Sequence, residues 1–248
     1  MLRNKMIDKK IGAEPHFNWR SHEPVRLEGF SDAVFAFAVT LLVVSLEVPK
    51  TFDELLETMR GFLAFGLCFS LLIWIWYNQY LYFRRFALNN GYVFALNALL
   101  IFVVLFYIYP HKFLFTFLAN IPMGLLGWSN LEDSLKMIRP EQTPTLMIIY
   151  SAGYLLVFFV MFLLYLHAYN KRNFLELNAS ETIVTKSEIQ SSALNMGIAL
   201  LSILIVLIGG VAYSAWAGWI YCLVGPALAI NGTVMGKKAK RAAEIITK

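Results

Sequence analysis

A short polar stretch at the start of an apolar run is the part of the chain best suited to specific polar contacts. It reads RLEGFSD, covers residues 26–32 and is followed directly by AVFAFAVTLLVVSLEV. On a helix, Arg26 and Asp32 are separated by about 9 Å of rise and about 240° of rotation, so they cannot pair along one face. A carboxylate among apolar residues needs donors from elsewhere. The candidate donors on neighbouring helices are Trp74, Trp76, Asn78 and Asn97.

The rest of the chain has no pattern typical of an enzyme or a metal centre. HExxH, GxSxG, P-loop and CxxC motifs are missing, and the four histidines are scattered, at positions 16, 22, 111 and 167. Cys68 and Cys222 fall in separate apolar runs, and we expect both to be buried, inert thiols. We therefore predict neither catalysis nor a cofactor or resident metal.

The composition is that of a membrane protein. Of 248 residues, 58% are hydrophobic and 15% charged, against about 25% charged in soluble domains. Charge-poor runs of roughly the length that crosses a bilayer recur along the chain, and they are continuously apolar, which favours helices over a barrel. We predict an all-α integral membrane protein with six transmembrane helices per subunit, at about 26–48, 56–84, 89–110, 145–168, 191–211 and 214–235. An amino-terminal segment, residues 1–25, precedes them, and a basic tail, residues 236–248, follows.

Some connections are less sharply defined by the sequence. Gly209 and Gly210 are the main sign of a turn between the last two helices. Residues 111–143 contain apolar clusters, and an interfacial helix, a re-entrant piece or an ordinary loop fits them. Residues 169–190 are polar, and we expect a helical extension with a turn near Asn178.

Basic residues are divided unevenly between the two ends of the predicted helices. The amino-terminal segment, the second and fourth connections and the tail hold sixteen lysines and arginines, and the opposite loops hold five. By the positive-inside rule both termini are cytoplasmic, and we expect a multi-pass protein of the plasma membrane. Topology and anionic lipid account for the net charge of +5. No nucleic-acid partner is implied.

The first predicted helix presents two contrasting stripes. One is small or polar and consists of Gly29, Ala33, Ala36, Thr40, Val43 and Glu47. The neighbouring stripe is bulky and apolar and consists of Phe30, Val34, Phe37, Leu41, Val44 and Val48. Two interpretations are open. Either the small stripe is a helix-packing seam and the bulky stripe faces lipid, or both surround a symmetry axis and form a narrow pore that gates by dewetting.

The stretch RLEGFSD followed by AVFAFAVTLLVVSLEVP resembles the first-helix signature of the transmembrane-protein-175 family of potassium channels, in its bacterial single-repeat form. WYNQY at 76–80 is similar to the family's second-helix segment. Asn97, with YIYP ending at Pro110, is similar to its third-helix pattern. The specific resemblance covers about the first 110 residues, and the later helices agree in number and hydrophobicity.

The resemblance implies a homotetramer in the lipid bilayer, in which four copies of the first helix line a central pathway. Potassium is the permeant ion, modestly preferred over sodium, and there is no TVGYG filter loop. The pore lining and constriction would come from Phe37, Thr40, Leu41 and Val44. A polar network tying the first helix to its neighbours would involve Arg26, Phe30, Ser31, Asp32, Trp76, Asn78 and Asn97. Arg26 taken alone is equally explained as an interfacial anchor.

Two positions depart from the family pattern. Phe37 stands where Ile or Leu is usual at the constriction, so four phenyl rings would make a tighter or differently gated plug. Gln79 or Tyr80 stands where the family often has a histidine, which alters the network and its response to pH. Two other functions stay open. One is a secondary transporter of a small cation, although ionisable residues are missing at mid-depth in the later helices. The other is a noncatalytic membrane scaffold.

Overall fold

The regular elements of the chain are helices. The structure is a computed structural model that describes residues 17–21, 23–44, 49–125 and 137–246, and no strand occurs in these ranges. The elements are α2 (Arg26–Val44), α3 (Phe52–Arg60), α4 (Phe62–Phe86), α5 (Gly91–Leu125), η1 (Pro140–Gln142), α7 (Thr143–Asn170), α8 (Ala179–Trp219), η2 (Ile220–Leu223) and α9 (Val224–Ile246). The predicted all-α class is confirmed.

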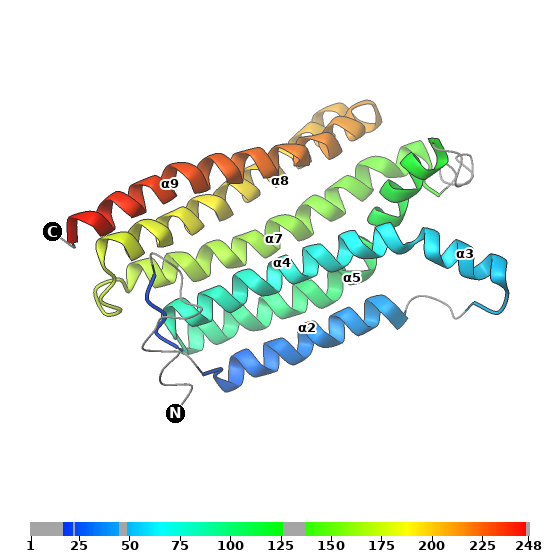
Figure 1. Ribbon diagram of the computed structural model, residues 1–248. Helices are drawn as coiled ribbons and strands as arrows, with labels where there is room; N and C mark the ends of the chain where they lie inside the picture. Colours follow the sequence, from blue (N-terminus) through cyan, green and yellow to red (C-terminus); the bar gives the residue numbers. More distant parts are fainter. Residues whose placement is uncertain (1–16, 22, 45–48, 126–136, 247–248) are drawn as a thin grey trace.

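The long helices run side by side in two groups (Figure 1). In the first, the α2 group, α2 packs on α4 and α5; in the second, the α8 group, α8 packs on α7 and α9. Contacts of α7 with α5 and α4 join the two groups. α2 and α8 begin, and α4, α7 and α9 end, at the same end of the molecule (Figure 1), which we call the terminal end.

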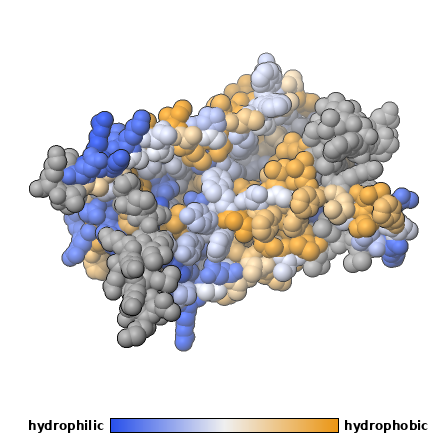
Figure 2. Space-filling view, in the orientation of Figure 1, coloured by the Kyte–Doolittle hydropathy of each residue, from blue (hydrophilic) through white to orange (hydrophobic). Residues whose placement is uncertain are grey.

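Four stretches of the described residues are long and apolar enough to cross a membrane: Phe62–Phe86, Gly91–Leu118, Pro140–Asn170 and Ala179–Glu244. The last has 66 residues, about three times the length of one crossing, and the chain folds back within it at Gly210 of α8 (Figure 1). Apolar side chains cover the middle of the molecule and hydrophilic ones gather at the terminal end (Figure 2). The predicted total of six spans stays a prediction.

Several helix boundaries differ from those predicted. α5 continues through Pro110 to Leu125, although proline in a helix interior removes one backbone hydrogen bond. The predicted 56–84 helix is divided at Gly61 into α3 and α4. Of the undecided 111–143 connection, residues up to 125 are helical, and 126–136 lie outside the described residues.

The glycine pair within α8 marks the point where the chain reverses, as predicted. Gly210 has φ 55° and ψ −138°, a conformation that glycine adopts with little strain. Ser202 Oγ donates to the Ala217 carbonyl at 2.9 Å across this turn, so the residues on its two sides run antiparallel.

The returning leg passes through η2 into α9, which begins at Val224 and continues through most of the predicted basic tail. Cys222 lies in η2 on this leg and is exposed. Its predicted burial was therefore wrong, whereas Cys68 is buried as predicted.

The predicted turn near Asn178 is confirmed. The Asn178 side chain accepts a hydrogen bond from the Glu181 backbone N–H at 2.8 Å, and the Glu181 carboxylate accepts one from the Asn178 N–H at 3.0 Å. This reciprocal pair is a capping box, which satisfies two backbone donors at the start of α8. It fixes the beginning of α8 at the terminal end, close to the residues considered below.

Candidate functional site

α2 has one buried and one exposed face within the single chain. Its buried residues are spaced like one side of a helix and consist of Glu28, Ser31, Phe35, Ala38 and Leu42. The exposed face runs the length of the helix and consists of Arg26, Gly29, Phe30, Ala33, Ala36, Phe37, Thr40 and Val43. From Gly29 to Val43 the predicted small stripe is thus not a packing seam inside the chain, and its last member, Glu47, lies outside the described residues. The described part of the stripe lies on the exposed side together with two of the phenyl rings.

A buried chain of hydrogen bonds connects α2, α5 and α4. Ser31 Oγ donates to the Leu27 carbonyl at 2.8 Å, and Asn97 Nδ2 donates to Ser31 Oγ at 2.8 Å. Gln79 Nε2 in turn donates to Asn97 Oδ1. All three polar side chains are buried, where an unmatched polar group would be costly. Gln79, one of the two positions at which a departure from the family pattern was predicted, therefore completes the network.

Asp32 finds its donor on α4. Trp76 Nε1 donates to Asp32 Oδ1 at 2.7 Å, a short, charge-assisted contact. The Trp76 ring stacks on Tyr80 with the ring centroids 5.8 Å apart. Among the predicted candidates, Trp76 is the residue that the structure places against Asp32.

Three predicted network residues lie apart from these contacts. Arg26 and Phe30 are on the exposed face, and no hydrogen bond or ion pair joins Arg26 to another described residue. Asn78 donates instead to the Trp74 carbonyl of its own helix at 2.7 Å. It faces a cavity of about 160 Å³, whose wall includes Ser192 and Asn195 of α8. Asn78 therefore belongs to the contact between the two helix groups.

The sequence analysis missed three ion pairs at the terminal end. Their partners and N···O distances are Arg84–Glu28 at 2.9 Å, Arg20–Glu181 at 2.9 Å and Arg85–Glu188 at 2.8 Å. Two features of the sequence could have indicated such pairs. They are the Arg84-Arg85 doublet at the end of an apolar run and the glutamate inside RLEGFSD. The positive-inside pattern accounts for the same arginines without indicating that they pair.

The predicted constriction residues differ in exposure. Phe37 is 56% exposed, Thr40 is exposed, and Leu41 is partly buried against the core. Thr40 Oγ1 donates to the Phe37 carbonyl at 2.7 Å. The hydroxyl proton is thereby used within the helix, and the oxygen keeps acceptor capacity for another group. The side chain of Val44 lies outside the described residues.

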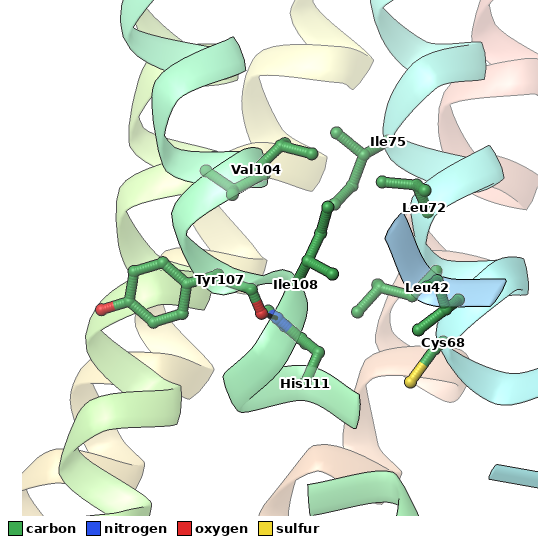
Figure 3. A pocket seen from close by; sticks show the side chains of 10 residues that line it. Leu42, Cys68, Leu72, Ile75, Val104, Tyr107, Ile108 and His111 are labelled. Atoms are coloured by element: carbon green, nitrogen blue, oxygen red, sulfur yellow. Dashed lines mark hydrogen bonds between the residues drawn. The ribbon is translucent and has the colours of Figure 1, made fainter. Parts of the chain in front are cut away.

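A small apolar cavity lies behind α2, on its buried side. Figure 3 shows Leu42 of α2 beside Cys68 and Leu72 of α4, with Val104, Ile108 and His111 of α5 around the same space. Its volume is about 40 Å³, little more than the space for a few waters. The cavity is thus separate from the exposed face and too small for an organic cofactor. Within the described ranges, no group of three His, Cys, Asp or Glu side chains is placed to hold a metal ion.

Known proteins match both the first helices and the whole chain. The family model described as "Endosomal/lysosomal potassium channel TMEM175" matches residues 26–107. A "Potassium channel" of Marivirga tractuosa is 37% identical over 243 residues, covering 96% of this chain and 98% of the relative. A potassium channel of Chamaesiphon minutus is 34% identical over 106 residues, covering 40% of this chain and 52% of that protein.

Solved structures agree with this assignment. A crystal structure of a variant of the potassium channel MtTMEM175, in complex with a nanobody–MBP fusion, has a TM-score of 0.81 at 36% identity and covers 92% of this chain and 100% of that chain. A homologue, from Chamaesiphon minutus, of the lysosomal potassium-selective channel TMEM175 has a TM-score of 0.55 at 23% identity and covers 83% of this chain and 96% of that one. The second likeness concerns the fold alone. The family consists of membrane-spanning ion channels, not enzymes, and by its near full-length similarity to the Marivirga protein this chain belongs to the TMEM175 family of potassium channels.

Proposed function

We propose that the chain forms a homotetrameric potassium channel whose ion pathway is lined by the exposed face of α2. The observation that carries this proposal is the continuity of that face, from Phe30 through Ala33 and Phe37 to Thr40. One such helix cannot enclose a pathway alone, so several copies must meet. Four as the number of subunits is inferred from the family resemblance, and potassium as the permeant ion is inferred from the names of the relatives.

The composition of the exposed face separates it from a surface made only for lipid. Within residues 200–208 of α8, the exposed side chains are all large and aliphatic: Leu200, Leu201, Leu204, Leu207 and Ile208. The α2 face instead alternates phenyl rings with Gly29, Ala33, Ala36 and Thr40. Small residues allow helices to approach closely in a membrane. This pattern favours contact with other copies of α2.

In the proposed pathway, Phe37 forms the narrowest layer and Thr40 the adjacent polar layer. A ring of apolar side chains blocks ions by excluding water when it is narrow. The Thr40 oxygen, whose proton is donated to the Phe37 carbonyl, would offer lone pairs to a partly dehydrated cation. Four hydroxyls form a weaker cage than stacked rings of carbonyls, so we expect modest selectivity for potassium over sodium.

We further propose six spans in the plasma membrane, with both termini in the cytoplasm. The spans would be α2, α4, α5, α7 and the two antiparallel legs formed by α8 and α9. Support comes from the hydrophilic terminal end (Figure 2) and the excess of lysine and arginine in the segments assigned to that side.

Reconstitution in liposomes tests the proposed function. We expect the purified protein to have four times the 28.3 kDa mass of one chain and to conduct potassium faster than sodium, without saturation or coupling to a second ion. Saturable, coupled uptake would support the transporter alternative. An intact tetramer without ion flux would support the scaffold alternative.

A further inference from the structure

A cavity of about 160 Å³ lies where the two helix groups meet. Its wall is formed by residues of α4 from the α2 group and by residues of α7, α8 and α9 from the α8 group. The apolar residues of the wall include Trp74, Phe158, Met161 and Leu228, and the centroids of the Trp74 and Phe158 rings are 5.3 Å apart. Spaces between the helices of a bundle are common sites for small ligands. Since an apolar cavity of about 150 Å³ accommodates benzene, this one has room for a molecule of one ring.

Two polar residues of the wall have hydrogen-bonding groups that are not used. Ser192 is 5% exposed, and its hydroxyl forms no hydrogen bond with another described residue. The Asn78 amide nitrogen donates to the Trp74 carbonyl at 2.7 Å, and no other described residue donates to the amide oxygen. A buried polar group without a partner costs free energy. Both groups therefore favour a polar partner inside the cavity, either water or a ligand that replaces it.

The rest of the polar wall is held by bonds of its own. Tyr154 donates its hydroxyl proton to Asn195 Oδ1 at 2.6 Å, and Asn195 Nδ2 donates to the Ser191 carbonyl at 2.8 Å. Asn231 Nδ2 donates to Ser191 Oγ at 2.9 Å. These contacts join α7, α8 and α9 around the cavity. A wall that is already ordered loses less conformational entropy when a ligand binds, so the two unused groups decide which ligand fits.

The charge in the wall favours a neutral ligand. Among the described residues that line the cavity, only Glu188 is charged. Arg85 Nη1 lies 2.8 Å from Glu188 Oε1, so this carboxylate already has a counter-charge. A cation that entered the cavity would lose its hydration without gaining an unpaired negative charge in return. A neutral molecule has no such cost.

We infer that this cavity is a binding site for a small neutral molecule of the phenol class, with one aromatic ring and one hydroxyl group. The ring occupies the space beside Trp74 and Phe158. The hydroxyl matches the two unused groups, because it can donate to the Asn78 amide oxygen and accept from the Ser192 hydroxyl. This site is separate from the exposed face of α2, and the inference does not depend on whether α2 lines an ion pathway.

Ligand-observed ¹⁹F NMR with the purified full-length protein in detergent tests the inference. We expect 4-fluorophenol to bind saturably, above the linear uptake by micelles. In 4-fluoroanisole a methyl group replaces the hydroxyl proton, and its Kd should be about three- to tenfold weaker, the range of one neutral hydrogen bond. No saturable binding, or equal affinity for both compounds, would overturn the inference. Tighter binding of 4-fluorobenzylammonium would overturn the neutral class of ligand.

Variants of α8 locate the binding. Ser192→Leu fills the cavity and should abolish saturable binding of 4-fluorophenol. Ala193→Leu is the matched control, because it adds a leucine at the neighbouring, exposed position, and it should bind as the wild type does. Wild-type affinity in Ser192→Leu would show that the ligand binds elsewhere.

A smaller change covers the case in which Ser192→Leu fails to assemble. Ser192→Ala removes only the hydroxyl and should weaken 4-fluorophenol about threefold or more. Binding of fluorobenzene, which has no hydrogen-bonding group of this kind, should stay the same. Unchanged affinity of Ser192→Ala for 4-fluorophenol would contradict the assigned role of Ser192 and overturn the site as described.

Discussion

The first turns of α2 and its later turns differ in what surrounds them. At the start, Ser31 and Asp32 contact α5 and α4 through hydrogen bonds, and Glu28 contacts α4 through an ion pair. Further along, Phe37 and Thr40 are exposed, and the Thr40 hydroxyl bonds only within its own helix among the described residues. The start of the helix is therefore fixed within one subunit, whereas the later turns have a face left for other copies. The residues that carry the family resemblance, RLEGFSD, anchor the helix. The residues further along it would contact the ion.

The largest expected effect is on the exposed part of α2. Phe37→Ala should raise basal potassium flux in liposomes by about tenfold or more, which requires lowering the barrier by only about 1.4 kcal/mol. The reason is that a wider apolar layer admits water more readily. Phe159→Ala removes an exposed phenyl ring from α7 and should leave flux unchanged. Equal effects of the two variants would remove the distinction between α2 and the other exposed helices.

The next largest effect is on the anchored part. Asn97→Ala removes hydrogen bonds to both Ser31 and Gln79, each worth about 0.6–2 kcal/mol between membrane helices. We expect a clear fall in the midpoint of thermal unfolding. Asn78→Ala is the matched control, because among the described residues its side chain bonds only the Trp74 carbonyl of its own helix. If Asn78→Ala lowered the unfolding midpoint as much as Asn97→Ala does, the hydrogen bonds of Asn97 would not be what anchors α2.

A single contact of the anchor should matter less. Trp76→Phe keeps an aromatic ring but removes the donor to Asp32, and we expect a loss of about 1–2 kcal/mol in unfolding free energy. Asp32→Ala should cost a similar amount. In the double variant the two losses should not add, because both remove the same hydrogen bond. Additive losses measured by chemical denaturation would show that the two side chains act independently.

The smallest expected effect concerns selectivity. Thr40→Val replaces the hydroxyl with a methyl group of similar size, and we expect the potassium-to-sodium permeability ratio to fall about two- to threefold, within the roughly 1 kcal/mol range of a single neutral hydrogen bond. Thr40→Ser keeps the hydroxyl and should retain the ratio. Bi-ionic reversal potentials measure both. A ratio unchanged in Thr40→Val would place selectivity elsewhere.

The hydropathy of the sequence was sufficient to predict the helical class, and the stretch RLEGFSD carried the family resemblance, because both depend on local runs of residues. The polar residues 169–190 likewise predicted the turn near Asn178. The sequence did not predict that Glu28 pairs with Arg84, because the partners lie far apart along the chain and only packing of α2 on α4 brings them together. Nor did it predict that α5 continues past Pro110, since hydropathy reports the apolar span but not how far a helix extends beyond it.

Exposure of the α2 face also had to come from the structure. Two stripes were visible in the sequence, but their spacing fits a packing seam as well as a pore. Within one chain, α2 turns Phe35, Ala38 and Leu42 to the core. Which face of α2 is buried depends on where Ser31 and Asp32 find their hydrogen-bond partners.

The most direct test of the account is whether a permeating ion reaches Thr40. We would replace the native thiols by Cys68→Ala and Cys222→Ser, introduce Thr40→Cys, and add Ag⁺, a monovalent cation that thiolates bind, during potassium recordings. Leu204→Cys, on the exposed side of α8, is the control. The account predicts that Ag⁺ blocks the current of Thr40→Cys channels and not that of the control. Unchanged current in conducting Thr40→Cys channels would contradict a pathway lined by α2.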